Sequence, residues 1–451
     1  MNKVIKNAKI VNSRDIYCAD VRIQDGVIVE IGQNITPEEG CTVIDAAGKY
    51  LIPGAVDGHT HMMDPGYTDR ETFAQGTAAA AVGGTTTVID HHRTDPLVHT
   101  AEILREKIAY LSDKAVVDFG LDGGSVPENI AELQAMWDAG CTAFKAFTCN
   151  LHGVKAMSSG YLLEMLRTVA SFGGTVLIHC EDDGILTAED ERLHREGRMD
   201  YMSQIEWRSP LAEEIAIDTV LRVCRATGAR VIVAHVSSPH LLRKLADARA
   251  EGVSIYSETC AHYFYLSEED LAKKGPWVKF TPPVTTKEKN EDMWRMLQRG
   301  LVTTIGSDHC PFPRSAKLPG EKNIWEAPNG IPGVETSMRL MLNGVAAGKI
   351  SINRLVEVMA ENPARVYGLA HRKGFIEVGK DADLVIVDMA KEQVLCDEQV
   401  VSKCGWTPYN GMHITGVPEM VFVRGELVAK DGCVVGKPGH GQFLHRGAVT
   451  I

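Results

Sequence analysis

Two histidines one residue apart, His59 and His61, are the first residues in this chain whose types and spacing could do chemistry. They end a short apolar segment that starts at Leu51. Side chains at positions i and i+2 of a strand point to the same face, so both imidazoles can reach one metal ion. The alternative is a pair of unrelated polar residues at a strand end. The later segments of the chain favour the metal site.

Further residues of metal-ligand type stand at the ends of later apolar segments. His179 ends segment 175–179, His235 ends segment 230–235, and Asp308 follows segment 302–307. Each alone has a structural alternative, since a histidine is often a satisfied rim residue and an aspartate can cap a helix. Together with the first pair they predict one cluster of ligands.

Lys145 lies inside a further apolar segment, 142–147, where an unpaired ammonium is costly. Burial depresses a lysine pKa and frees a neutral amine, which can take up carbon dioxide and become a carbamate. That anion has two oxygens and suits a bridge between two cations. A lysine that reaches the rim, or one that forms a Schiff base, is the alternative. The four histidines favour the carbamate.

Short apolar segments that alternate with longer helical patterns must position these residues, and this alternation is typical of parallel βα units. Helical patterns are expected at 71–82, which Gly83 and Gly84 end, and at 240–251. We expect eight strands and therefore a TIM (β/α)8 barrel, with an open doubly wound sheet as the alternative. The strands are expected at 52–61, 85–91, 116–121, 142–147, 175–179, 230–235, 254–259 and 302–307.

The two ends of the chain alternate apolar and polar residues, and Asp25-Gly26 is a hairpin signal. Neither end has enough strands for a core of its own, so we expect one small β-sandwich domain built from both termini. The predicted domains are 1–52 with 373–451 for the sandwich and 53–372 for the catalytic barrel.

Composition excludes several classes of protein. A net charge of −12 argues against nucleic acid as a partner, and no apolar run is long enough to span a membrane. The N-terminal residues show no signal-peptide pattern, and the eleven cysteines contain no Cys-x-x-Cys pair. We therefore expect a cytoplasmic protein with reduced thiols and a small-molecule substrate.

The motifs that carry these residues resemble those of the amidohydrolase superfamily. The match is strongest with the cyclic amidases: hydantoinases, dihydropyrimidinases, allantoinases and dihydroorotases. The resemblance runs from Asp57-Gly58-His59-Thr60-His61 through 258–263 to Gly441-Gln442-Phe443.

The resemblance implies two divalent metal ions, with zinc expected, although the ligand types also suit manganese, iron or cobalt. It implies that His59, His61 and Asp308 hold one ion, that His179 and His235 hold the other, and that N6-carboxylated Lys145 bridges them. It further implies that a bridging hydroxide attacks the ring amide, with Asp308 as the proton shuttle. Relatives are commonly dimers or tetramers, so a homo-oligomer is expected.

The motifs indicate less clearly which cyclic amide is the substrate. Met63 and Arg93 depart from the arginine and asparagine typical of dihydroorotases, and Asn150 replaces a tyrosine typical of dihydropyrimidinases and D-hydantoinases. We expect a hydantoin- or dihydropyrimidine-type ring, with an L-hydantoinase or allantoinase as the nearest likeness. Allantoinase is the alternative, and a non-catalytic scaffold is a remote one. The resemblance implies that Thr281 and Asn329 bind the substrate's amide edge.

The segment His91-His92-Arg93 departs from all of these patterns. It follows the second expected strand, so Arg93 or a histidine could contact a polar substituent of the substrate. The alternative is a set of solvated loop charges, and the role of the segment stays open.

Overall fold

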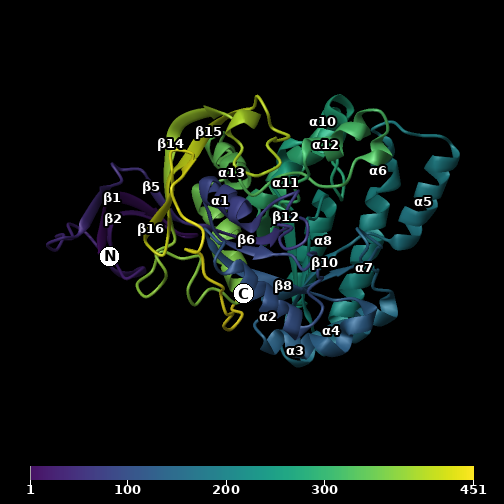
Figure 1. The fold of residues 1–451 in the computed structure, drawn as a ribbon, viewed down its shortest axis with the longest axis horizontal. Helices are drawn as coiled ribbons and strands as arrows, with labels where there is room; N and C mark the ends of the chain where they lie inside the picture. The colour runs from purple at the N-terminus through teal and green to yellow at the C-terminus, as the bar shows by residue number, and fades with distance from the viewer. Residues whose placement is uncertain (1) are drawn as a thin grey trace.

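Eight parallel strands form the centre of the molecule in a computed structural model that describes residues 2–451. Each strand pairs with the next along the chain, and a bridge between Thr60 and His309 joins the first to the last. The TIM barrel is confirmed (Figure 1). Its strands are β6 (Ala55–Thr60), β7 (Thr85–Asp90), β8 (Asp118–Gly124), β9 (Ala143–Phe147), β10 (Thr175–His179), β11 (Arg230–Val233), β12 (Ile255–Cys260) and β13 (Thr304–Gly306).

Helices cover the outside of the barrel, and the longer ones bury an apolar face. In α4 the buried side chains Leu162, Met165, Leu166 and Val169 follow helical spacing. The helices are α1 (Phe73–Gly83), α2 (Ala101–Leu111), α3 (Leu133–Asp138), α4 (Ser159–Ser171), α5 (Asp183–Arg195), α6 (Ser203–Trp207), α7 (Pro210–Thr227), α8 (Pro239–Ala250), α9 (His262–Tyr265), α10 (Glu268–Lys274), α11 (Lys287–Gln298), α12 (Arg314–Lys317), α13 (Ser337–Ala346), α14 (Ile352–Val356) and α15 (Asn362–Val366).

The two ends of the chain form a second sheet beside the barrel, as expected. Its two halves meet where β5 pairs antiparallel with β14, and a hairpin at Asp25-Gly26, both with positive φ, joins β2 to β3. A separate apolar cluster fills this domain. The strands are β1 (Lys3–Val11), β2 (Ile16–Gln24), β3 (Val27–Gly32), β4 (Thr42–Asp45), β5 (Tyr50–Pro53), β14 (Leu384–Val394), β15 (His413–Val423), β16 (Glu426–Lys430) and β17 (Cys433–Val434).

One barrel strand lies further along the chain than the sequence pattern indicates. The expected segment 116–121 is displaced to Asp118–Gly124, which includes three glycines, and the last two of them form a pair that is typical of a turn. A Cβ at Gly124 would lie 2.3 Å from the ring of His92, and one at Gly120 would lie 2.4 Å from Thr142. Glycine therefore belongs to this strand because neighbouring side chains approach its backbone.

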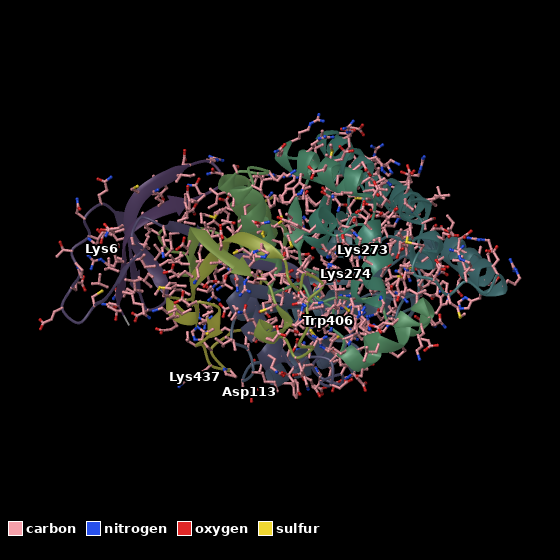
Figure 2. All side chains as sticks on the ribbon, turned by 90° about the horizontal axis from the view of Figure 1, so that it is seen from above. Lys6, Asp113, Lys273, Lys274, Trp406 and Lys437 are labelled. Carbon is pink, nitrogen blue, oxygen red and sulfur yellow. The ribbon has the colours of Figure 1, made fainter. Side chains whose placement is uncertain are left out.

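The two domains lie side by side along the long axis of the molecule. Figure 2 shows Lys6 near one end of the molecule, on the terminal sheet, and Lys273 and Lys274 well away from it, within the barrel part. We propose the domain limits 1–52 with 373–451 and 53–372. Within residues 2–451, no helix combines the length and apolar character needed to cross a bilayer.

Candidate active site

One cavity at the carboxyl ends of the barrel strands is lined by every residue that the sequence assigned to metal or substrate. These side chains come from segments that lie up to 270 residues apart in the chain, and the barrel brings them to one rim. Of the cavity's lining, the sequence predicted His59, His61, Arg93, Lys145, His179, His235, Thr281, Asp308 and Asn329.

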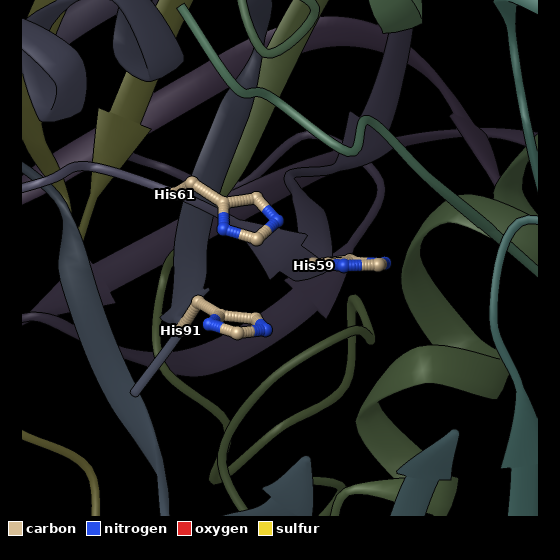
Figure 3. A group of neighbouring side chains, drawn as sticks. All are labelled: His59, His61 and His91. Carbon is tan, nitrogen blue, oxygen red and sulfur yellow. The ribbon is translucent and has the colours of Figure 1, made fainter. Parts of the chain in front are cut away.

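The end of β6 holds the first pair of histidines. The rings of His59 and His61 lie 5.3 Å apart between centroids. Asp57 Oδ1 fixes this end, because it accepts hydrogen bonds from the backbone N–H groups of His59 (3.2 Å) and Ser307 (3.0 Å). The second bond ties β6 to the end of β13. Figure 3 shows the two rings facing His91, which follows β7.

Asp308 stands between these two imidazoles. Its Oδ1 lies 3.2 Å from His61 Nε2 and 3.4 Å from His59 Nε2. The residue has a positive φ of 45°, a backbone conformation that is costly for a residue other than glycine and that clusters at functional sites. The three expected ligands of one metal ion are therefore mutual neighbours.

His179 and His235 form the second group, at the ends of β10 and β11. Their Nδ1 and Nε2 atoms face each other at 2.9 Å. The ring of His235 lies 5.4 Å from that of His59, so the second group adjoins the first. His235 also has a positive φ, 37°.

The histidines of the cavity are held in the neutral form that binds metals. Burial lowers the pKa of His59 to about 3, and nearby Lys145 adds to this effect. Burial also lowers the pKa of His61 and His235 well below the ordinary value, and that of His179 below it. Neutral imidazoles offer a lone pair to a cation.

Lys145 reaches this cluster from the interior of β9, fully buried. Its Nζ lies 3.3 Å from His59 Nε2, and within residues 2–451 it forms no ion pair with a carboxylate. Burial lowers the pKa of the amine, although the more distant carboxylates Glu258 and Asp308 oppose that shift. Burial of this unpaired amine therefore favours its neutral form.

The residues present fit a divalent metal ion. Buried nitrogens without any hydrogen-bond partner include His61 Nδ1 and His235 Nδ1, and unpartnered buried polar atoms are rare. One nitrogen atom of His59 and one of His61 also lie within 4.8 Å of each other. Imidazoles with one aspartate are a donor set suited to zinc and similar ions.

Two buried glutamates support the histidines, and no sequence motif indicated a role for either. Glu258 Oε1 in β12 lies 2.8 Å from His59 Nδ1, and Glu181 Oε2 lies 2.6 Å from His179 Nε2. A carboxylate on the second nitrogen orients a ligating histidine. Glu181 also accepts hydrogen bonds from Arg208 and Thr281. An acid inside a buried strand, and an acid two residues after a histidine, are the signals that could have found them.

The residues expected to bind substrate are held by polar networks. Thr281 Oγ1 donates to Glu181 Oε2 at 2.7 Å, and Asn329 Oδ1 accepts from Gln204 Nε2 at 2.9 Å. The loop that carries Asn329 is fixed by buried Lys279, which donates to two of its carbonyl oxygens, at 2.7 and 2.6 Å. Polar groups for a substrate therefore adjoin the histidines on a rigid support.

Comparisons with known proteins agree with this geometry. The amidohydrolase family model matches residues 50–428. An L-hydantoinase from Paenarthrobacter aurescens is 37% identical over 448 residues, 98% of each chain, and a D-hydantoinase from Geobacillus stearothermophilus is 35% identical over 99% of this chain and 97% of its own. The solved structure of an L-hydantoinase (dihydropyrimidinase) from Arthrobacter aurescens superposes with a TM-score of 0.95 at 36% identity, covering 98% of this chain and 99% of its own.

Proposed function

The chain belongs to the amidohydrolase family and is a cyclic amidohydrolase, and from that premise we propose that it opens the amide bond of a hydantoin- or dihydropyrimidine-type ring in the cavity described above. The named relatives favour this ring type over the allantoinase alternative. The intact set of metal-binding residue types argues against a non-catalytic scaffold.

We assign His59, His61 and Asp308 to one divalent ion and His179 with His235 to a second, with zinc as the expected metal. Support comes from the short separations within each group and from the neutral state that burial imposes on the imidazoles. When bound, such ions polarise a carbonyl oxygen and lower the pKa of a water molecule.

The observation that carries the proposal is the unpaired, buried Lys145 among neutral histidines. We assign it as N6-carboxylated, because a neutral amine adds carbon dioxide and releases one proton to give a carbamate anion. That anion would balance part of the positive charge of two metal ions, whereas the amine carries no negative charge.

Asp308 is assigned as the group that moves the proton. Its carboxylate lies beside His59 and His61, where an attacking water would be held. As the oxygen–carbon bond forms, Asp308 takes the proton from water. It then gives that proton to the ring nitrogen as the carbon–nitrogen bond breaks. Thr281 and Asn329 are assigned to hold the amide edge of the ring, since both adjoin the histidines in the cavity.

Substitution of Asp308 by asparagine tests this assignment. We expect Asp308→Asn to lose turnover by about 10²–10⁴-fold, because the amide cannot carry the proton, while circular dichroism stays unchanged. The matched control is Asp247→Asn, at an exposed position on α8, which should retain activity. Near wild-type turnover by Asp308→Asn would remove Asp308 from this role.

A substrate panel tests the ring type. The metal-loaded enzyme should hydrolyse hydantoin and dihydrouracil faster than allantoin in parallel assays. Faster turnover of allantoin would reverse the order of the two candidates, and no turnover of any ring would contradict the proposed function.

We also propose a homo-oligomer, a dimer or tetramer, in the cytoplasm. The exposed apolar side chains Leu211 and Ile215 share one face of α7, and the eleven cysteines are free thiols, which suits a reducing compartment. Light scattering of the purified protein measures the oligomeric state.

A further inference from the structure

One guanidinium group in the cavity has no partner. Arg93 lines the same cavity as His59, Lys145 and Asp308. Its Nη1 is fully buried without a hydrogen bond, and in residues 2–451 the side chain forms no ion pair. Burial lowers the pKa of Arg93. The side chain as a whole is partly buried, and an unpaired charge withdrawn from water is costly, so such groups are normally paired.

The backbone of Arg93 is firmly held, so its position is built into the fold. The N–H of Arg93 donates to His91 Nδ1 at 3.1 Å, and the carbonyl oxygen of His91 accepts from Lys107 Nζ at 2.9 Å. Lys107 in turn pairs with Asp90 Oδ2, the last residue of β7, at 2.7 Å. A buried lysine and a buried histidine thus anchor the loop, and the Arg93 side chain alone extends into the cavity.

The tautomer of His91 follows from the same contact. Because Nδ1 accepts a hydrogen bond, the ring proton lies on Nε2, which is buried and has no acceptor. The ring stacks on His61 at 4.2 Å between centroids. A second hydrogen-bond donor therefore stands beside the metal-binding residues without a partner.

The neighbouring charges leave this side of the cavity positive. Arg70 is already engaged, since its Nε donates to the carbonyl oxygen of Pro311 at 3.0 Å and its guanidinium lies 3.5 Å from the ring centre of Phe312. Asp308 is the acid near enough to act on Arg93, but its carboxylate contacts His59 and His61. Arg208 is neutralised by Glu181.

We propose that the substrate ring carries an anionic substituent, a carboxylate, and that Arg93 binds it. Guanidinium and carboxylate match in a planar, bidentate geometry, and the pair would satisfy Nη1. The Nε2–H of His91 would donate to the same carboxylate or to a ring oxygen. This inference rests on the proposed function and narrows its substrate class to acidic cyclic ureides.

A matched pair of rings tests the inference in the metal-loaded enzyme. One hydantoin carries a carboxymethyl arm at C5, and the other carries the neutral carboxamide of the same size. We expect the wild-type enzyme to favour the carboxylate in kcat/KM by about 10- to 100-fold, mostly through KM, the range for a charge-assisted hydrogen bond. In Arg93→Gln that ratio should fall to near 1.

Two further variants make the result specific. Arg93→Lys keeps the charge but loses the planar fork, so an intermediate ratio is expected. Arg105→Gln makes the same chemical change at an exposed position on α2 and should leave the ratio unchanged. If Arg93→Gln fails to fold, the kcat/KM ratio of the wild type and that of Arg93→Lys still test the inference.

A wild-type ratio near or below 1, or the same ratio in Arg93→Gln as in the wild type, would overturn the inference. Turnover of unsubstituted hydantoin without turnover of the carboxymethyl ring would also overturn it while the proposed function stands. Loss of turnover on every ring, unsubstituted hydantoin included, would instead count against the proposed function and the inference together.

Discussion

Two lysines of this molecule are buried to the same degree, but one has carboxylate partners and the other has none among the described residues. Lys145 in the barrel and Lys373 at the junction of the two domains are each 1% exposed. Lys373 Nζ lies 2.8 Å from Asp381 Oδ2 and 2.7 Å from Asp383 Oδ2, and it also pairs with Asp118. Lys145 has no such partner in the described chain, and its Nζ contacts an imidazole nitrogen, His59 Nε2, at 3.3 Å.

The difference separates a structural lysine from a chemical one. At Lys373 the fold supplies carboxylates from both domains as ion-pair partners of a buried amine. The three aspartates could by their geometry hold a cation of another kind, and the lysine already fills that place. At Lys145 the fold withholds the carboxylates, which favours a neutral amine that can react. Pairing, rather than burial, distinguishes the two sites.

The largest expected effect comes from removing the reactive lysine. Lys145→Met should lower turnover on the order of 10³-fold or more, together with metal content, because a bridging anion is lost. With metal removed from both proteins, the stability of the variant to urea should not fall below that of the wild type, since an unpaired buried amine is replaced by an apolar group. Metal analysis and urea unfolding measure these effects.

A rescue experiment sharpens the same comparison. If the carbamate is what matters, short carboxylic acids such as acetate should restore part of the activity and metal content of Lys145→Ala, whereas alkylamines should not. Full metal occupancy in Lys145→Met would contradict the bridging role.

The matched substitution at the paired lysine should act on stability. Lys373→Met removes the cation that three buried carboxylates share, although Arg424 still pairs with Asp118 and Arg372 with Asp381. Because Asp383 is left buried without a cation, we expect the free energy of unfolding to fall by about 3–5 kcal/mol. Turnover per folded molecule should stay near that of the wild type, because Lys373 does not line the cavity. An unchanged midpoint of urea unfolding would show that the cluster is not a structural one.

The sequence predicted the first lysine and could not predict the second. Lys145 interrupts an apolar strand, and the ligands around it stand at strand ends that a barrel must bring together. Lys373 lies in a polar stretch typical of solvated surface, and Asp118 is 255 positions away. Only the packing of the terminal sheet against the barrel joins them, and no local periodicity records that contact.

The same limit applies to the rest of the fold and site. Eight strands follow from apolar runs, but β8 is displaced because its glycines serve close packing rather than a turn. Glu258 contacts a histidine on another strand, and Glu181 contacts the histidine two residues before it. Their roles can be recognised only from the distances between these side chains. Arg93 was expected near the substrate, but its lack of a partner is visible only in three dimensions.

The effect of pH should distinguish the paired cluster further. Burial raises the pKa of Asp383, and Lys373 opposes that shift. In Lys373→Met the pKa rises further, so the folded state binds more protons than the unfolded state between about pH 4 and the raised pKa. Stability is therefore lost as pH rises through that window. The deficit relative to wild type should be smaller at pH 5 than at pH 8, by about 1–2 kcal/mol.

Urea unfolding of both proteins at the two pH values measures this difference. Equal deficits at pH 5 and pH 8 would mean that the carboxylates do not take up the protons, and that the loss of stability has another cause.

The smallest effect is expected where a lysine is paired but exposed. Lys391 Nζ lies 3.1 Å from Asp431 Oδ1 in the terminal domain, with 42% and 52% of the two side chains exposed. Lys391→Met should change the free energy of unfolding by no more than about 0.5 kcal/mol, because water replaces the lost partner and salt already screens the pair. A loss as large as that in Lys373→Met would mean that ion pairing alone, rather than pairing combined with burial, sets the stability of this domain. A negligible loss leaves burial as the condition under which the fold must either neutralise a lysine, as at Lys373, or use it, as at Lys145.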